Sequence, residues 1–190
     1  MTEITVLTGK LTSGVERFVL HWGDLGGSWG VSRSVAQIHA LLFVSARPMT
    51  AEEIADALNL ARSNVSNSIR DLVAWGLVKR APVFGDRRDW FEAEGDVLEM
   101  VSKIVALRKA RELDPASAVL AQCLAEVKAD PAASPAAAAR MEGLQELLTT
   151  LNNWYEQMNR VPRAQLLPLL RLGSKAVELL APFIKKKEKP

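Results

Sequence analysis

The chain is poor in cysteine and histidine: Cys123, His21 and His39 are the only ones in 190 residues. One cysteine cannot form a disulfide within a chain, and these three side chains do not have the spacing of zinc ligands. No apolar run approaches the roughly 18 residues that a membrane-spanning helix requires. The opening residues, MTEITVLTGK, lack the charged and apolar regions of a secretory signal peptide. These absences predict a globular, cytoplasmic protein without metal or other cofactor.

An excess of charge of one sign is also absent. The formal net charge is only +2, from 24 basic and 22 acidic residues, and 48% of the residues are hydrophobic. This balance is ordinary for a globular chain and does not by itself indicate a nucleic-acid partner. The sequence also lacks a nucleophile with a matching base and a pair of carboxylates with separable roles. We therefore do not expect an enzyme.

The segment from residue 49 to residue 94 carries the clearest local signals. Thr50 and Glu53 are spaced as a capping box, in which each side chain bonds the backbone N–H of the other residue. An amphipathic helix follows, and Asn59, which tolerates a left-handed backbone, can end it. A second helix is predicted to begin at Arg62 and to end at Gly76. Two short helices joined by a tight turn predict a helix-turn-helix.

The second helix has two distinct faces. Its apolar residues recur at helical spacing and predict the buried side: Val65, Ile69, Leu72 and Val73. Hydrogen-bond donors fill the other positions near its start: Arg62, Ser63, Asn64, Ser66, Asn67 and Arg70. Such donors fit the base edges of a DNA major groove. We expect Asn64, Asn67 and Arg62 to contact bases and Arg70 to contact phosphate. A merely solvated polar face is the alternative.

A hairpin with a basic tip is predicted directly after this helix. Residues 77–83 and 88–93 are apolar or alternating runs, and the sequence FGDR between them contains a Gly-Asp turn pair. Pro82 cannot donate to a strand ladder, so its strand should lie at a sheet edge. Four basic residues belong to the hairpin: Lys79, Arg80, Arg87 and Arg88. We expect the first two to hold phosphates and the last two to enter a minor groove, whose negative potential attracts arginine. Asp86 could instead bond Arg88 and orient it.

The order of these elements resembles the winged-helix regulators of the MarR class, and most closely their GbsR branch. The resemblance rests on AEEIADALNLARSNVSNSIRDLVAWGLVKR, on GDRRDWFEAEGDVLEMVSKIV and on GSWGVSRSVAQIHALLFVS upstream, and covers about residues 14 to 115. It implies a homodimeric, sequence-specific regulator of transcription, most often a repressor, on a palindromic operator. Two departures concern the turn. Asn59 stands where such turns usually carry Gly. Ala61 stands where a Ser or Thr N-cap is usual, so a stabilisation of about 1 kcal/mol is missing unless Ser63 supplies the cap.

Two helices are predicted upstream, with a glycine-rich stretch between them. Gly23, Gly26, Gly27 and Gly30 should break the regular structure and form a compact connection. They do not fit a phosphate-binding loop, because no strand precedes them and no Lys-Ser/Thr pair follows. The second of these helices, capped by Ser32, is apolar over much of its circumference and should be central to the core.

The remainder of the chain predicts a helical extension. Leucine-rich helices run to about residue 185 and are candidates for the interface of a homodimer, or they fold back on their own winged helix. The expected fold class is mainly α: a winged helix-turn-helix DNA-binding domain with a two-stranded wing (12–94), a helical dimerisation and effector region (95–185) and a disordered basic tail (186–190).

Aromatic residues leave the question of a small-molecule effector open. Trp22, Trp29, Trp154 and Tyr155 flank the central segment and could line a pocket for an apolar or cationic ligand. Aromatic residues at helical spacing usually belong to a core instead. The resemblance to the GbsR branch implies choline or glycine betaine.

Two functions remain for the winged helix itself. One is binding to double-stranded DNA, and the other is a protein-interaction module that no longer binds DNA. Between residues 62 and 88 the chain has six basic residues and two acidic ones, Asp71 and Asp86. This local excess favours DNA.

Overall fold

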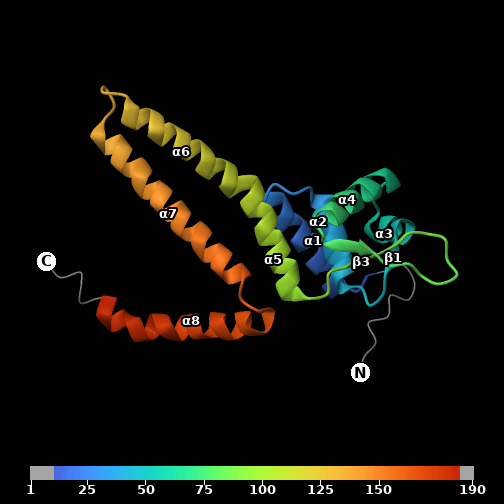
Figure 1. The fold of residues 1–190 in the computed structure, drawn as a ribbon. Helices are drawn as coiled ribbons and strands as arrows, with labels where there is room; N and C mark the ends of the chain where they lie inside the picture. Colours follow the sequence, from blue (N-terminus) through green and yellow to red (C-terminus); the bar gives the residue numbers. More distant parts are fainter. Residues whose placement is uncertain (1–10, 185–190) are drawn as a thin grey trace. The chain divides into compact units, whose positions relative to one another are not determined.

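The computed structural model describes residues 11–184 (Figure 1). The chain divides into two compact units, one ending at Arg108 and the other beginning at Lys109. In chain order the elements are α1 (Ser13–Ser28), α2 (Arg33–Val44), β1 (Met49–Thr50), α3 (Ala51–Leu58), α4 (Arg62–Ala74), β2 (Val78–Arg80), β3 (Trp90–Ala93), α5 (Val97–Arg108), the π-helical turn η1 (Lys109–Leu113), α6 (Asp114–Ala129), α7 (Pro135–Asn159) and α8 (Arg163–Ile184). The basic tail predicted for residues 186–190 lies outside the described residues.

The core of the first unit is built around α2. Both α1 and α4 pack against this helix, and α3 and β3 also contact it. Ile38 and Leu41 are at most 1% exposed, and their neighbours along α2 are buried on nearly every side. The prediction that this helix is central is confirmed. Met100 of α5 is buried in the same core, so the first unit extends through α5.

Local rules fix the geometry of the helix-turn-helix, as predicted. The backbone N–H of Glu53 donates to Thr50 Oγ1 (3.3 Å), and the backbone N–H of Thr50 donates to Glu53 Oε2 (2.8 Å), which completes the capping box of α3. Asn59 has φ of 50° and ends α3 in the left-handed conformation. The backbone N–H of Leu60 then bonds the carbonyl of Ala55. The turn between α3 and α4 is therefore set by backbone bonds.

The wing belongs to a three-stranded antiparallel sheet with the order β1-β3-β2. The sequence predicts β2 and β3, although both are shorter than the runs that indicated them. The short strand β1 is an addition: Met49 and Thr50 pair with Phe91 and Trp90. This pairing ties the start of α3 to the base of the wing. Pro82 follows β2, which is an edge strand as predicted.

Most of the glycine-rich stretch is helical, which corrects the sequence prediction for Gly23, Gly26 and Gly27, whereas Gly30, with φ of 74°, lies in the connection between α1 and α2 as predicted. Helix α1 continues through Gly23, Gly26 and Gly27 and ends at Ser28. A Cβ atom at Gly26 would collide with the Cβ of Ala36 in α2, and one at Gly23 would lie 2.6 Å from Cγ of Gln37. These two glycines let α1 and α2 approach closely, and the benefit of that contact outweighs the poor helix propensity of glycine.

The second unit is a set of long helices. α6 and α7 pack against each other, and they are linked by an ion pair between Lys128 and Glu142 (2.6 Å) and by a hydrogen bond from Gln145 to Ser117 (3.4 Å). Pro135 is the first residue of α7, where its missing N–H does no harm. None of the residues described in this unit is buried. Its helices therefore form no core of their own.

Two findings concern what residues 11–184 do not contain. None of their helices combines the length and the hydropathy needed to span a membrane. They also bring together no group of three metal-binding side chains.

Among the side chains that the structure describes, His39 is the one buried titratable group. It is 3% exposed and lies between Trp22 and Phe43, with 6.4 Å from its ring centre to each of theirs. Within the described residues its Nε2 atom has no hydrogen-bond partner. Burial without a partner disfavours the charged ring and lowers the pKa of His39 to about 4.

We predict that Gly26→Ala destabilises the first unit by about 1–3 kcal/mol, because its methyl group would press against Ala36. Gly27→Ala is the matched control: nothing lies within 4 Å of its added Cβ, so it should be neutral or stabilise by up to about 1 kcal/mol. Urea denaturation followed by circular dichroism measures both changes. Equal effects of the two substitutions would contradict the close packing of α1 and α2.

The burial of His39 also predicts a pH dependence of stability. Its folded pKa of about 4 lies below the unfolded value of 6.5, so the unfolded chain binds the proton more tightly. The contribution to stability is complete above about pH 6.5 and is lost as the pH falls toward 4, by roughly 3 kcal/mol in total. In His39→Leu this part of the pH dependence should disappear, whereas the exposed His21→Gln control should retain it. Identical pH profiles for H39L and the parent protein would refute the assignment.

Candidate nucleic-acid interface

Helix α4 presents the predicted donor residues on its outer face. Val65, Ser68, Ile69 and Leu72 are buried against the core. Val73, which the apolar spacing placed on the buried side, is instead 39% exposed and lines the cleft described below. The six residues predicted to carry hydrogen-bond donors to DNA are all exposed: Arg62, Ser63, Asn64, Ser66, Asn67 and Arg70. The exposed face results directly from the apolar spacing, because burying one side of a helix turns the intervening positions outward.

The first turn of α4 has no side-chain cap, which agrees with the departure noted at Ala61. Ala61 occupies the N-cap position and makes no side-chain hydrogen bond, and Ser63 does not take over that role. The backbone N–H groups of this turn therefore remain available at the positive end of the helix dipole. Such a helix start favours an anionic group beside Ser63.

The structure constrains Asn64 more than the sequence suggested. Its Oδ1 accepts hydrogen bonds from the hydroxyls of Ser34 (3.0 Å) in α2 and Ser68 (3.3 Å) in α4. A bidentate contact to adenine needs this oxygen as an acceptor, so it would require these two bonds to open. Within residues 11–184, the side chain of Asn67 makes no hydrogen bond, so its amide can contact a base without breaking an existing bond.

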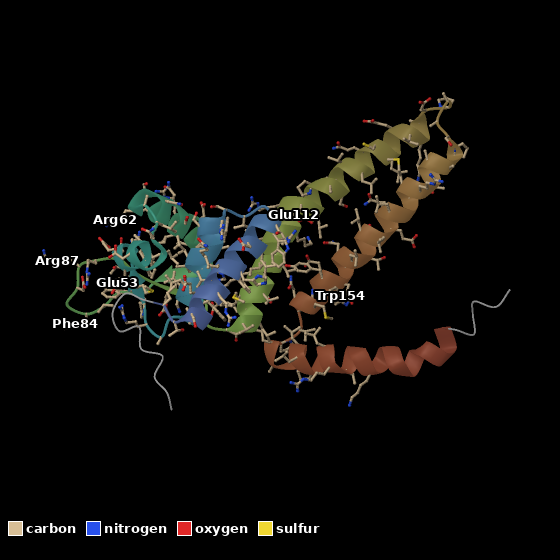
Figure 2. The ribbon with its side chains drawn as sticks, turned by 180° about the vertical axis from the view of Figure 1, so that it is seen from behind. Glu53, Arg62, Phe84, Arg87, Glu112 and Trp154 are labelled. Carbon is tan, nitrogen blue, oxygen red and sulfur yellow. The ribbon has the colours of Figure 1, made fainter. Side chains whose placement is uncertain are left out.

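An open cleft of about 400 Å³ lies between α3, α4 and the wing. Its walls carry four of the predicted arginines: Arg62, Arg70, Arg80 and Arg88. Glu52 and Asp89 also line it, with Ser66 and a few apolar side chains at its base. Figure 2 shows Arg62 of α4 and Arg87 of the wing at the same end of the first unit. The helix and the wing thus form one surface, as the sequence analysis required.

Most of the basic side chains on this surface already hold an acidic neighbour. Arg62 pairs with Glu52, Lys79 with Glu92 (3.1 Å), Arg80 with Asp89 (3.3 Å) and Arg88 with Asp86 (2.6 Å). Within the part of the chain that the structure describes, Arg70 and Arg87 are the two of the six without an ion pair. The excess of basic residues counted between residues 62 and 88 therefore overstates the positive electrostatic potential of this surface. The acidic partners Glu52, Asp89 and Glu92 lie outside the counted range.

Arg88 is oriented from two sides at the base of the wing. Its guanidinium and its backbone N–H both donate to the carboxylate of Asp86, and its Cζ lies 5.1 Å from the centre of the Trp90 ring. The bonds from Arg88 lower the pKa of Asp86 to about 2. Arg47 also lies over Trp90 (5.7 Å) and pairs with Glu53 of the capping box (2.8 Å). A continuous set of contacts thus joins the wing to the start of α3.

The sequence analysis did not single out Arg47. Arg47 stands before a proline at the end of a helix, which gives no sign of a contact with a residue on β3. Cation–π contacts of this kind depend on strand pairing, which a single sequence does not display.

The aromatic residues considered for an effector cage do not assemble one within either unit. Trp22 packs in the core against Phe18. Trp29 is half exposed, and Arg108 lies 5.2 Å from its ring centre. In the second unit, Nζ of Lys109 lies 5.4 Å from the ring centre of Tyr155, whereas Trp154 is exposed. Side chains of the protein itself already occupy the ring faces of Trp29 and Tyr155.

Comparison with known proteins agrees with this geometry. The model of the MarR family matches residues 29–89, a segment that contains α2, α3, α4 and the outer part of the wing. A crystal structure of a transcriptional regulator is 21% identical, covers 76% of this chain and 94% of its own, and superimposes with a TM-score of 0.57. The chain is thus similar to MarR-family regulators in fold, a winged helix with a helical extension.

Two further solved structures are more distant. The transcriptional regulator Tm0710 of Thermotoga maritima is 16% identical over 75% of this chain and 92% of its own, with a TM-score of 0.36. A mutant of MepR from S. aureus, bound to an oligodeoxyribonucleotide, is 19% identical over 74% of this chain and 99% of its own, also with a TM-score of 0.36. No curated protein matches the sequence.

Proposed function

We propose that this protein is a sequence-specific, double-stranded DNA-binding regulator of transcription that acts as a homodimer. The observation that carries the proposal is the cleft between α4 and the wing, where four arginines from both elements face one space. A duplex laid on this surface would place α4 in the major groove and the wing over the adjacent minor groove. Ser66, Asn67 and Arg62 would contact base edges, with Ser63 and Asn64 beside them.

The basic side chains have separate tasks in this proposal. Arg70, Lys79 and Arg80 hold phosphates, and the uncapped start of α4 offers its N–H groups to another. Arg87 and Arg88 reach into the minor groove. Four of the predicted basic residues exchange an acidic neighbour for DNA when they bind. This exchange limits the affinity for DNA, because each carboxylate that stays near the phosphates repels them.

The second unit supports the homodimer. Leu144, Leu147, Leu151 and Trp154 recur on one face of α7 and are 49–56% exposed. Leu170 and Leu172 of α8 are about as exposed, at 62% and 60%. Rows of apolar side chains of this size mark interaction surfaces. A second copy of the same chain covers them with a surface of the same kind and brings two recognition helices to two half-sites.

The simplest way in which such a dimer regulates transcription is repression. A dimer that covers two half-sites about one helical turn apart excludes other proteins from that stretch of the duplex. The resemblance to the GbsR branch adds a small-molecule effector. We assign no effector site, because the protein's own cations lie over Trp29 and Tyr155.

The first test of the proposal is the salt dependence of binding to a duplex selected from random DNA. With about four phosphate contacts per protomer, the slope of log K against log salt should be near −7 for the dimer. Arg70→Ala should make the slope shallower by about 2, since one contact is lost in each protomer. Arg140→Ala in α7 removes the same charge and should leave the slope unchanged. A parent slope near zero would contradict DNA binding.

A second prediction concerns the carboxylate that pairs with Arg80. Asp89→Asn removes a negative charge from the cleft and frees Arg80 for phosphate, so it should tighten DNA binding by about 3- to 10-fold at low salt. Glu146→Gln in α7 is the charge-matched control and should change affinity by less than about 2-fold. Fluorescence anisotropy with the selected duplex measures both. Weaker binding by D89N would mean that Asp89 positions Arg80 for DNA instead of competing with it.

A third prediction tests the dimer. Leu147→Glu places a charge in the exposed apolar row of α7 and should convert the dimer to monomer at micromolar concentration. Asn153→Glu adds the same charge to the polar side of α7 and should leave the dimer intact. Sedimentation velocity measures the oligomeric state. If L147E remained dimeric, or the parent protein were monomeric, the proposed interface would be wrong.

A further inference from the structure

The wing ends in an aromatic residue that the sequence analysis did not use. Phe84 is 106% exposed, which is more than any other large hydrophobic side chain whose exposure the structure describes. Figure 2 shows it at the extremity of the wing, with Arg87 nearby. An aromatic ring held wholly in water contributes nothing to the core, so its value lies in what it contacts outside the protein.

The backbone around Phe84 forms a defined turn. The N–H of Asp86 donates to the carbonyl of Val83 (3.1 Å), so Phe84 and Gly85 are the two central residues of a β-turn. Gly85 has φ of +82°, a conformation that glycine adopts without strain and that the third residue of a type II turn needs. Asp86, the last residue of the turn, is in turn fixed by its bonds to Arg88. The turn therefore directs Phe84 away from the sheet.

The surroundings of Phe84 indicate the kind of surface it meets. Arg87 is exposed and, among the described residues, has no ion pair, while the guanidinium of Arg88 pairs with Asp86 and lies over the ring of Trp90. An apolar ring with arginines close to it in the chain fits a narrow minor groove: the guanidiniums meet its negative potential, and the ring meets sugars and base edges. Proteins that bend DNA insert side chains such as Phe, Leu and Met between base steps from this groove.

We propose that Phe84 is a minor-groove wedge, which inserts at a base step on the outer flank of each half-site. This inference rests on the proposed DNA-binding function and adds a contact to it. Pyrimidine–purine steps such as TA and CA/TG unstack most easily, so the wedge favours them at the position under the wing. The protein would thereby gain sequence preference at base pairs that α4 does not contact.

The salt dependence of binding distinguishes the contact made by Phe84 from the contacts made by the arginines of the wing. A ring that inserts between bases releases no counterions, so its loss weakens binding without changing the salt slope. Loss of Arg87 makes the slope shallower by about 2 for the dimer. The two neighbouring residues thus make different, measurable contributions.

The experiment compares Phe84→Ala, Phe84→Leu, the neighbouring Val83→Ala and Arg87→Ala in the full-length protein, on the selected duplex. F84A should weaken binding by at least about 30-fold with the parent slope, because the dimer loses two stacking contacts, one per protomer, and each alone is worth roughly 5- to 100-fold. F84L should retain most of the affinity, and V83A should change it by less than about 2-fold. Thermal melting should be unchanged in F84A, because the ring is not buried.

A duplex with 2-aminopurine at the step under the wing reports the insertion directly. Its fluorescence should rise on binding of the parent protein and of F84L, and should not rise with F84A. Parent affinity for F84A, or an unchanged fluorescence signal in the parent complex, would overturn the wedge while leaving DNA binding in place. If the parent protein bound no selected duplex at all, the proposed function itself would fail, and the wedge with it.

Discussion

The packing of α4 against α2 determines where the predicted donor side chains of α4 point. Val65 and Leu72 of α4 are at most 1% exposed, as are Ile38 and Leu41 of α2. Because helical residues three or four positions apart share a face, burying these side chains leaves a single exposed face with the donor residues. The capping box before α3 and the left-handed Asn59 fix the angle at which α4 leaves the turn. The exposed donor face of α4, which we propose contacts DNA, is thus a consequence of the core.

The second feature of the surface is its balance of charge. Pairing four of its six basic residues with Glu52, Asp86, Asp89 and Glu92 leaves, among the residues that the structure describes, only Arg70 and Arg87 as uncompensated charges on this surface of the free protein. Exposed pairs of this kind are worth at most about 1 kcal/mol each, so a phosphate can replace the carboxylate at small cost. Such a surface disfavours indiscriminate binding to any polyanion, because each new contact must replace an existing one. The contacts among Arg47, Trp90 and Arg88 also couple the wing to α3.

Short-range rules made much of this predictable. The capping box, the end of α3 at Asn59 and the exposed face of α4 each follow from residues within a few positions of one another. Most of the failures involve partners distant in sequence. Gly26 looked like a helix breaker, because its contact with Ala36 of α2 is invisible in the sequence. Asn64 looked free, although Ser34 holds its oxygen. The strand β1 is too short for any periodicity to reveal it.

The central claim is that α4 and the wing contact DNA together through one surface. It is tested most directly by the perturbation of backbone amide NMR signals when the selected duplex is added to labelled protein. We predict the largest shifts in residues 62–70 and 80–88, with little change at Arg17 and Leu20 on the exposed side of α1. Shifts confined to the wing, or unperturbed signals along the outer face of α4, would contradict the account.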